Sequence, residues 1–218
     1  MATVTENISA AMVKELREKT GAPMMDCRSA LVEAKGNLEE AVVVLRKKGM
    51  ASAAKKSGRT ASEGAVGTYI HAGGKIGVLL EINCESDFVA RTADFQELLK
   101  DVAMHIAATD PRYIRREDVT AADMEREKDI YRAQAAATGK PAPVVEKIVE
   151  GKMAKFYEEV CLLEQPFIKD QSVSIKELIA QKVGKLGENI TVRRFARFKV
   201  GAPEWTVAQA KVTEAAGE

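Results

Sequence analysis

The chain has 218 residues, which is enough for one sizeable domain and a small satellite. Hydrophobic residues make up 46% and charged residues 30%, a composition that supports a packed core and argues against disorder throughout. The 33 lysines and arginines nearly balance the 32 aspartates and glutamates, so a protein whose main role is to coat nucleic acid is disfavoured. Aromatic residues, at only 5%, disfavour a deep aromatic ligand cage or a base-stacking platform.

The cysteines and the N-terminal residues indicate the cellular compartment in which the protein is expected. Cys27, Cys84 and Cys161 are sparse, odd in number and far apart, which is typical of a reducing compartment and not of a disulfide framework. Residues 1–10 (MATVTENISA) lack the basic stretch and apolar run of a signal peptide. No apolar run approaches the ~18 residues that span a bilayer. We therefore expect a cytoplasmic protein with no membrane partner.

Residues 1–50 predict an N-terminal module of three short helices, over residues 9–20, 23–35 and 37–48. Each begins at a residue suited to a helix N-terminus and is followed closely by a glycine, with Gly49 ending the third. Helices this short are marginal alone, so they are expected to pack together.

Residues 51–63 are expected to form a basic linker. A run of cations without an intervening acid begins in the preceding helix and continues into it. The connector interpretation is favoured over a phosphate- or acid-binding strip, because a charge run alone specifies little. The cations are Arg46, Lys47, Lys48, Lys55, Lys56 and Arg59.

Residues 64–200 are predicted to form an α+β core domain. Segments 64–71 and 75–84 predict a β-hairpin, and segment 190–200 predicts a third strand, which together make a small three-stranded antiparallel sheet. Apolar residues at helical spacing predict an amphipathic helix over 95–108 that packs on the sheet.

A protruding antiparallel helical hairpin is predicted over residues 121–161 of the core domain. Its helices span 121–138 and 144–161, and a turn that contains Gly139 and Pro141 separates them. A further helix is expected from Ser174 to about Gly184, and residues 201–218 are expected to be a flexible tail.

The sequence carries few residues suited to catalysis. It has no phosphate-binding glycine loop, no Cys-x-x-Cys pair and no His-x-x-x-His pair. His105 fits either a helix-surface contact or a satisfied structural residue, and the structural interpretation is favoured. A catalytic thiol at Cys84 has little support, because no base lies near it in sequence. We therefore expect a binding protein with no metal and no cofactor, and not an enzyme.

The segment from Asn83 to Arg91 leaves an apolar strand and precedes a helix. In one interpretation Ser86 or Asp87 caps the helix and Phe88 packs into the core. In the other, the acid and the aromatic ring stand exposed at the corner and form a binding hot spot. The residue pattern does not choose between the two.

Four segments together resemble the elongation factor Ts family, the nucleotide-exchange factors of elongation factor Tu. They occur in family order and cover nearly the whole chain to about Val200. They are residues 13–27 (VKELREKTGAPMMDC), 81–91 (EINCESDFVAR), 103–108 (AMHIAA), and 149–153 (VEGKM) with 165–167 (QPF).

Two departures from the family pattern matter. Ser86 stands where the family usually has threonine, and it keeps the hydroxyl group. Long members carry two copies of the sheet-and-helix subdomain, whereas this chain carries one, like the short members. The resemblance therefore implies a homodimer that is joined through the sheet, and an open sheet edge is also a physical reason to expect pairing.

The resemblance also implies a fold and a mechanism. The N-terminal module is similar to a ubiquitin-associated fold, and Asp87 and Phe88 are expected to act as a wedge beside the magnesium and nucleotide site of elongation factor Tu. GDP would then leave and GTP would replace it, with no direct nucleic-acid contact. The other residues that the resemblance implies are Ser86 and Val89 in the wedge motif, and His105, Met24, Met25, Val13 and Leu16 as secondary contacts.

Two other classes of function remain as alternatives. An adapter for ubiquitin-like proteins or peptides would use the N-terminal module and leave the rest of the chain without a role. An RNA-binding accessory factor would use the basic linker together with Arg193, Arg194, Arg197 and Lys199 of the last strand, but the neutral total charge and scarce aromatics weigh against it.

Overall fold

A computed structural model describes residues 8–137, 139, 141–202 and 206–209. The chain divides into two compact units, and each is assembled from segments that are far apart in sequence. The first unit comprises Met1–Gly64, Asn83–Leu98 and Glu177–Thr191, and the second comprises Ala65–Ile82, Leu99–Lys176 and Val192–Glu218.

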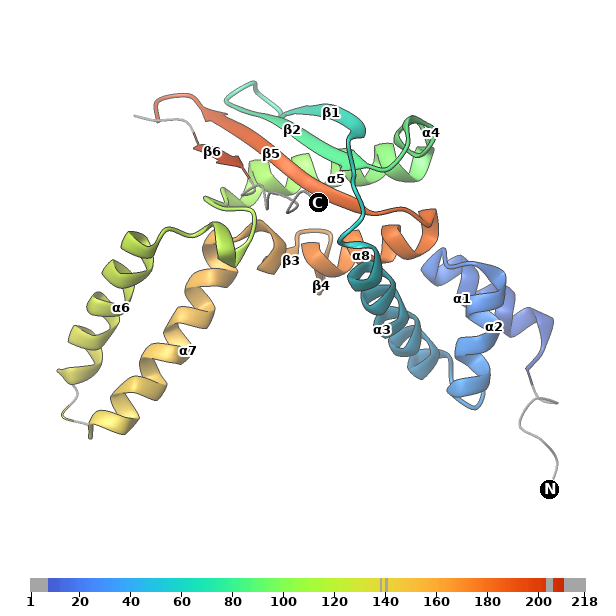
Figure 1. Cartoon of the computed structure of the whole chain (residues 1–218), viewed down its shortest axis with the longest axis horizontal. Coiled ribbons are helices and arrows are strands. Elements are labelled where there is room, and N and C mark those ends of the chain that lie inside the picture. The colour runs from blue at the N-terminus through green and yellow to red at the C-terminus, as the bar shows by residue number, and fades with distance from the viewer. Residues whose placement is uncertain (1–7, 138, 140, 203–205, 210–218) are drawn as a thin grey trace, which may run out of the picture. The chain divides into compact units, whose positions relative to one another are not determined.

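The predicted N-terminal module is present as three packed helices, α1 (Ala10–Thr20), α2 (Met24–Glu33) and α3 (Leu38–Lys56) (Figure 1). Ser9 caps α1 by accepting from the backbone N–H of Met12, and Gly21 ends it in the left-handed region at φ 65°. The helices enclose a small apolar core of Val13, Leu16, Cys27, Ala30, Leu31, Ala34 and Ala41.

The third helix is longer than predicted, because α3 continues through Gly49 to Lys56. Gly49 does not end the helix; it permits a close approach to α8 (Ile175–Leu186). A Cβ atom at Gly49 would lie 3.5 Å from the carbonyl oxygen of Ala180, and one at Gly184 would lie 3.7 Å from the Cα of Gly49. The first part of the expected linker, residues 51–56, is therefore helix, and the Nζ of Lys56 donates to the carbonyl oxygen of Val183 in α8 at 3.4 Å.

The main sheet has four strands in the order β1 (Glu63–Ile70), β2 (Ile76–Cys84), β5 (Ile190–Lys199) and β6 (Thr206–Gln209). The β1–β2 turn uses Gly73 and Gly74, both at positive φ, as a tight reversal requires. The prediction of a flexible tail is wrong for residues 206–209, which form β6 and pair antiparallel with β5. The other residues of that tail, 203–205 and 210–218, lie outside the described residues.

The amphipathic helix is confirmed as α5 (Ala93–Thr109), which runs along one face of the sheet (Figure 1). Within the second unit, β1 and α5 approach closely at Gly67 of β1. A Cβ atom at Gly67 would lie 2.6 Å from the Cγ of Leu99 in α5. The buried apolar residues of the strands and the helix include Val78, Leu80, Ile82, Phe95, Leu98, Val102 and Ile106.

The helical hairpin is confirmed as α6 (Ala121–Ala136) and α7 (Ala142–Val160), which pack against each other (Figure 1). Its apolar seam includes Val149, Met153 and Phe156. A second, two-stranded sheet of β3 (Pro166–Phe167) and β4 (Asp170–Ser174) was not predicted. None of the helices in the described ranges combines the length and the apolar character needed to cross a bilayer.

Candidate functional site

The predicted corner lies where β2 ends and the four-residue helix α4 (Asp87–Ala90) begins. Ser86 is the N-cap of α4, with its hydroxyl oxygen accepting from the backbone N–H of Val89 at 3.4 Å. Val89 is half-buried and Ala90 is buried, so the second half of α4 packs against the rest of the first unit. The capping role that the sequence offered for Ser86 is confirmed.

Phe88 has a different environment from the one that the core interpretation required. Its side chain is 77% exposed, more than any other large hydrophobic residue in the described part of the chain. The core interpretation of Phe88 is therefore wrong. Beside it, Asp87 forms an ion pair with Arg91, with 2.7 Å between Oδ2 and Nη2. The corner thus presents an exposed aromatic ring flanked by a carboxylate.

A second turn of the first unit holds this corner in place. The carboxylate of Glu188, in the loop between α8 and β5, accepts from the backbone N–H groups of Glu85 at 3.1 Å and Ser86 at 3.0 Å. It also accepts from the Ser86 hydroxyl at 2.5 Å. Sequence reasoning missed Glu188, because nothing local links it to a residue about a hundred positions earlier. The only local signal is Gly187, at φ 81°, which marks a turn after α8.

Cys84 belongs to the interior of the same corner. Its side chain is fully buried, and its Sγ donates to the carbonyl oxygen of Ser86 at 3.1 Å. Burial raises the pKa of the Cys84 thiol, and the nearby carboxylate of Glu188 adds to the increase. A thiol with a raised pKa is a poor nucleophile at neutral pH, which argues against the thiol-enzyme alternative.

The residues expected to contact a partner from the N-terminal module fall into two groups. Met24 and Met25, at the start of α2, are 47% and 70% exposed and form part of the surface. Val13 and Leu16 are 6% and 0% exposed and belong to the core of the module. The two methionines are therefore available for contact, whereas Val13 and Leu16 support the helices that carry them.

His105 lies in the interior of the second unit with no exposed surface. Its Nε2 is 2.9 Å from the Oε1 of Gln165, and its Nδ1 is 3.4 Å from the backbone nitrogen of Ile168. Burial lowers the pKa of His105, and the contact with Gln165 opposes this only in part. The structure thus places His105 in its structural role, tying α5 to the segment that carries Gln165.

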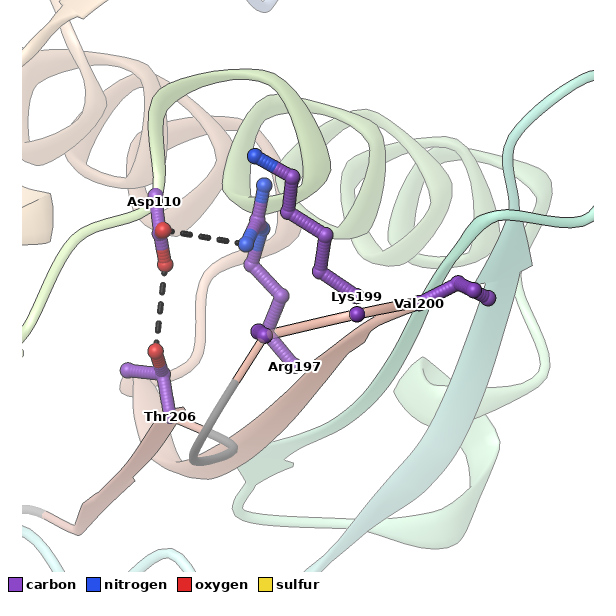
Figure 2. Close-up of a pocket in the computed structure, with 7 residues that line it drawn as sticks. Asp110, Arg197, Lys199, Val200 and Thr206 are labelled. Carbon is purple, nitrogen blue, oxygen red and sulfur yellow. Dashed lines mark hydrogen bonds and ion pairs between the residues drawn. The ribbon is translucent and has the colours of Figure 1, made fainter.

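A polar pocket of about 360 Å³ lies at the end of β5 (Figure 2). Arg197, 7% exposed, donates to the carbonyl oxygen of Ala107 and forms an ion pair with Asp110 at 3.0 Å. The hydroxyl of Thr206 donates to the other Asp110 oxygen at 3.1 Å. These contacts tie the C-terminal end of α5 to β5 and β6, and none of the predicted site residues lines the pocket.

The basic strand proposed for RNA binding is already partly neutralised. Besides the pair of Arg197 with Asp110, Arg194 forms an ion pair with Glu81 of β2, with 2.6 Å between Nε and Oε2. Cations held this way offer less charge to a phosphate backbone, which weakens the RNA-binding alternative. Among the residues that the structure describes, no cluster of three histidine, cysteine, aspartate or glutamate side chains is arranged to hold a metal ion.

The fold and the corner define a class: a small α+β protein with a helical N-terminal module and a helix-covered antiparallel sheet that ends in an exposed Asp-Phe corner. The family model described as elongation factor TS matches residues 1–202. The chain is 71% identical over 207 residues to elongation factor Ts of Koribacter versatilis, covering 95% of this chain and 94% of that protein. The chain belongs to the elongation factor Ts family.

Other relatives agree in length as well as in sequence. Elongation factor Ts of Solibacter usitatus is 62% identical over 194 residues, which cover 89% of this chain and 92% of that protein. The protein of the same name from Fervidobacterium nodosum is 60% identical, over 89% of this chain and 98% of that protein. Membership implies a nucleotide-exchange factor that acts in translation elongation.

Proposed function

We propose that this protein binds elongation factor Tu in its GDP-bound state and releases the GDP, so that GTP can bind during translation elongation in the cytoplasm. Membership of the elongation factor Ts family supports the reaction, and one observation supports the site. Phe88, 77% exposed, stands on a corner that is fixed by hydrogen bonds from two chain segments. An exposed ring on a fixed support is suited to insertion into a partner.

Asp87 and Phe88 form the proposed wedge, with Ser86 and Val89 holding its base. GDP in such a GTPase is held largely by Mg²⁺ and by backbone N–H groups around its phosphates. Mg²⁺ tolerates little departure from octahedral geometry, so a wedge that moves a neighbouring element by about an ångström weakens its hold on the nucleotide. No acid, base or nucleophile is consumed in this step.

The direction of exchange follows from linkage. A factor that binds the nucleotide-free GTPase more tightly than the GDP-bound GTPase must weaken GDP binding by the same factor. GTP binding then displaces the exchange factor in turn. Met24 and Met25 are proposed as further contacts with the GTPase, while Val13, Leu16 and His105 act from the interior by supporting the elements that make contact.

The test is the release of fluorescent GDP from elongation factor Tu in the presence of excess unlabelled GDP. The unaltered chain should accelerate release strongly, and Phe88→Ala or Asp87→Ala should reduce the acceleration at least tenfold while circular dichroism shows an intact fold. Ile130→Ala, which truncates a 43% exposed side chain on α6, serves as the matched control and should retain full activity. A folded, inactive parent chain would refute the function, and full activity in Phe88→Ala would refute the wedge.

A second proposal concerns the oligomeric state. The face of the main sheet that α5 leaves uncovered carries a shallow apolar groove whose lining includes Ile70, Leu79, Phe198 and Val200. These residues are 66%, 47%, 52% and 71% exposed, and apolar residues that are exposed together on one face are suited to an interface. We propose that this face joins two copies of the chain in a homodimer, which is what the resemblance to the short family members implies.

A further inference from the structure

At the base of the corner, two turns of the first unit are joined by hydrogen bonds in which a carboxylate of each turn accepts from the backbone of the other. Glu188 accepts from three donors of the β2–α4 turn, namely the N–H groups of Glu85 and Ser86 and the hydroxyl of Ser86. In return, the carboxylate of Glu85 accepts from the backbone N–H of Asn189 at 2.6 Å. Each turn therefore depends on the other for its backbone hydrogen bonds, and we call this pair of interactions the carboxylate clasp.

A third segment reinforces the carboxylate clasp. The side chain of Asn189, only 4% exposed, donates from Nδ2 to the backbone carbonyl of Arg59 at 2.8 Å. The guanidinium of Arg59 in turn lies 3.5 Å from the carboxylate of Glu85. The segment after α3, expected from sequence to be a solvated connector, is thus attached to the same junction.

The short helix α4 needs such outside support. Four residues form too few internal hydrogen bonds to hold a helix by themselves, so the direction of α4 must come from its ends. The residue at its N-terminal end is Ser86, whose hydroxyl both donates to Glu188 and accepts from the N–H of Val89. Asp87 and Phe88 follow directly, and their positions are set by the residue that Glu188 holds.

We propose that Glu188 is a positioning residue for nucleotide exchange: it fixes the Ser86 turn, so that Phe88 is held ready for insertion before the GTPase is bound. This inference rests on the proposed function. Preorganisation removes the cost of ordering a loop at the moment of binding, and a corner that is competent for only part of the time is less effective by that fraction. Glu188 makes no contact with the nucleotide in this scheme and acts only through the corner.

The substitution that isolates this role is Glu188→Gln. It keeps the size of the side chain, but an amide nitrogen replaces one carboxylate oxygen and cannot accept from the donors that face it. A hydrogen bond to a charged group outweighs one to a neutral group, so we expect the maximal rate of GDP release to fall about tenfold. The matched control is Glu158→Gln, which removes a charge from an exposed position on α7.

Two measurements separate positioning from a general loss of structure. Backbone amide exchange should speed up at Glu85 and Ser86 in Glu188→Gln, while the protection of α1 and α2 stays unchanged. In a double-mutant cycle, Glu188→Gln should cost little in a Phe88→Ala background, because the ring that it positions is gone. Additive effects of the two substitutions would overturn the inference, as would a normal release rate in Glu188→Gln.

Ser86 supplies a second route if Glu188→Gln does not fold. Ser86→Ala removes the hydroxyl that Glu188 binds and should also slow GDP release. Equal activity in Ser86→Ala and the parent chain would overturn the inference. If the parent chain itself fails to accelerate release, the proposed function fails, whereas an active parent with an unaffected Glu188→Gln and Ser86→Ala refutes only the positioning role.

Discussion

Arg91 forms an ion pair with Asp87 across the single turn of α4, with 2.7 Å between Nη2 and Oδ2, and the exposed ring of Phe88 lies next to Asp87 in the chain. The side chains of Arg91 and Asp87 are 77% and 45% exposed, respectively. The pair is therefore surrounded by water and can open at little cost. In the proposed wedge, a carboxylate held this weakly is available to a new partner.

The first prediction follows from that exposure. Arg91→Ala should lower the free energy of unfolding by less than about 1 kcal/mol, because exposed ion pairs contribute little. Urea denaturation followed by circular dichroism measures the change. Lys14→Ala, which removes another exposed pair at 3.8 Å from Glu18, should behave similarly. A loss above roughly 2 kcal/mol for Arg91→Ala would mean that Arg91 supports the corner itself.

The second prediction concerns the contact between β1 and α5. In Gly67→Ala the new methyl group would lie 2.6 Å from the Cγ and 2.8 Å from the Cδ2 of Leu99, so that the strand or the helix must move. Overpacking of this kind costs roughly 1–3 kcal/mol. We expect the urea midpoint to fall with an unchanged slope.

Gly151→Ala is the control for Gly67→Ala. Gly151 lies inside α7, and nothing lies within 4 Å of the position where its Cβ atom would be. Alanine is favoured over glycine in a helix interior by about 1 kcal/mol, so Gly151→Ala should stabilise the protein. Two substitutions of the same size should therefore act in opposite directions. Destabilisation by both would contradict the steric explanation.

The fold could be predicted from sequence where local rules agree with packing. Ser9, Gly21 and Asn37 mark helix ends by their own hydrogen-bonding or conformational properties, and the structure confirms each of them. By the same rule Gly49 was predicted to end the third helix, and this was wrong. A glycine is needed there for the close approach of α8, which lies more than a hundred residues later in the chain. The strand β6 was missed for a similar reason, since its short sequence gains order from pairing with β5.

The candidate site was only half predictable. The sequence identified the corner at Ser86–Val89, because an apolar strand followed by capping residues is a local pattern. It left the environment of Phe88 undecided, because exposure depends on whether other segments cover the ring. Glu188 could not be found at all, since its contacts with Glu85 and Ser86 join residues that only the fold brings together.

The third prediction concerns pH. Burial lowers the pKa of His105 in the folded state, so the unfolded chain binds a proton that the folded chain does not. The stability contributed by His105 is therefore fully present above the unfolded pKa of about 6.5 and is lost as pH falls from there towards the folded pKa. The slope from this one group is at most about 1.4 kcal/mol per pH unit.

Urea denaturation of the parent chain at several pH values between about 7.5 and 5 measures that slope. His105→Asn should be less stable at every pH, because it disturbs the buried contact with Gln165, but it should lack this part of the pH dependence. An unchanged slope in His105→Asn would contradict the assignment.

The last prediction tests the proposed dimer. Leu79 lies on β2 with 47% of its side chain exposed, and it lines the apolar groove on the uncovered face of the main sheet. Leu79→Asp should therefore leave the chain folded, yet place an unpaired charge in the interface, where burial without a partner is strongly unfavourable. Light scattering during size-exclusion chromatography should report twice the chain mass for the parent and the single-chain mass for the variant at the same concentration.

Ile130→Asp is the matched control for Leu79→Asp, because it adds the same charge to an exposed apolar position on α6. It should remain dimeric. If Leu79→Asp is also dimeric, the two copies meet through another surface, and the exposed apolar face needs a different explanation. If the parent chain is monomeric at all concentrations, the homodimer proposal fails, while the proposed wedge at Phe88 is tested separately by GDP release.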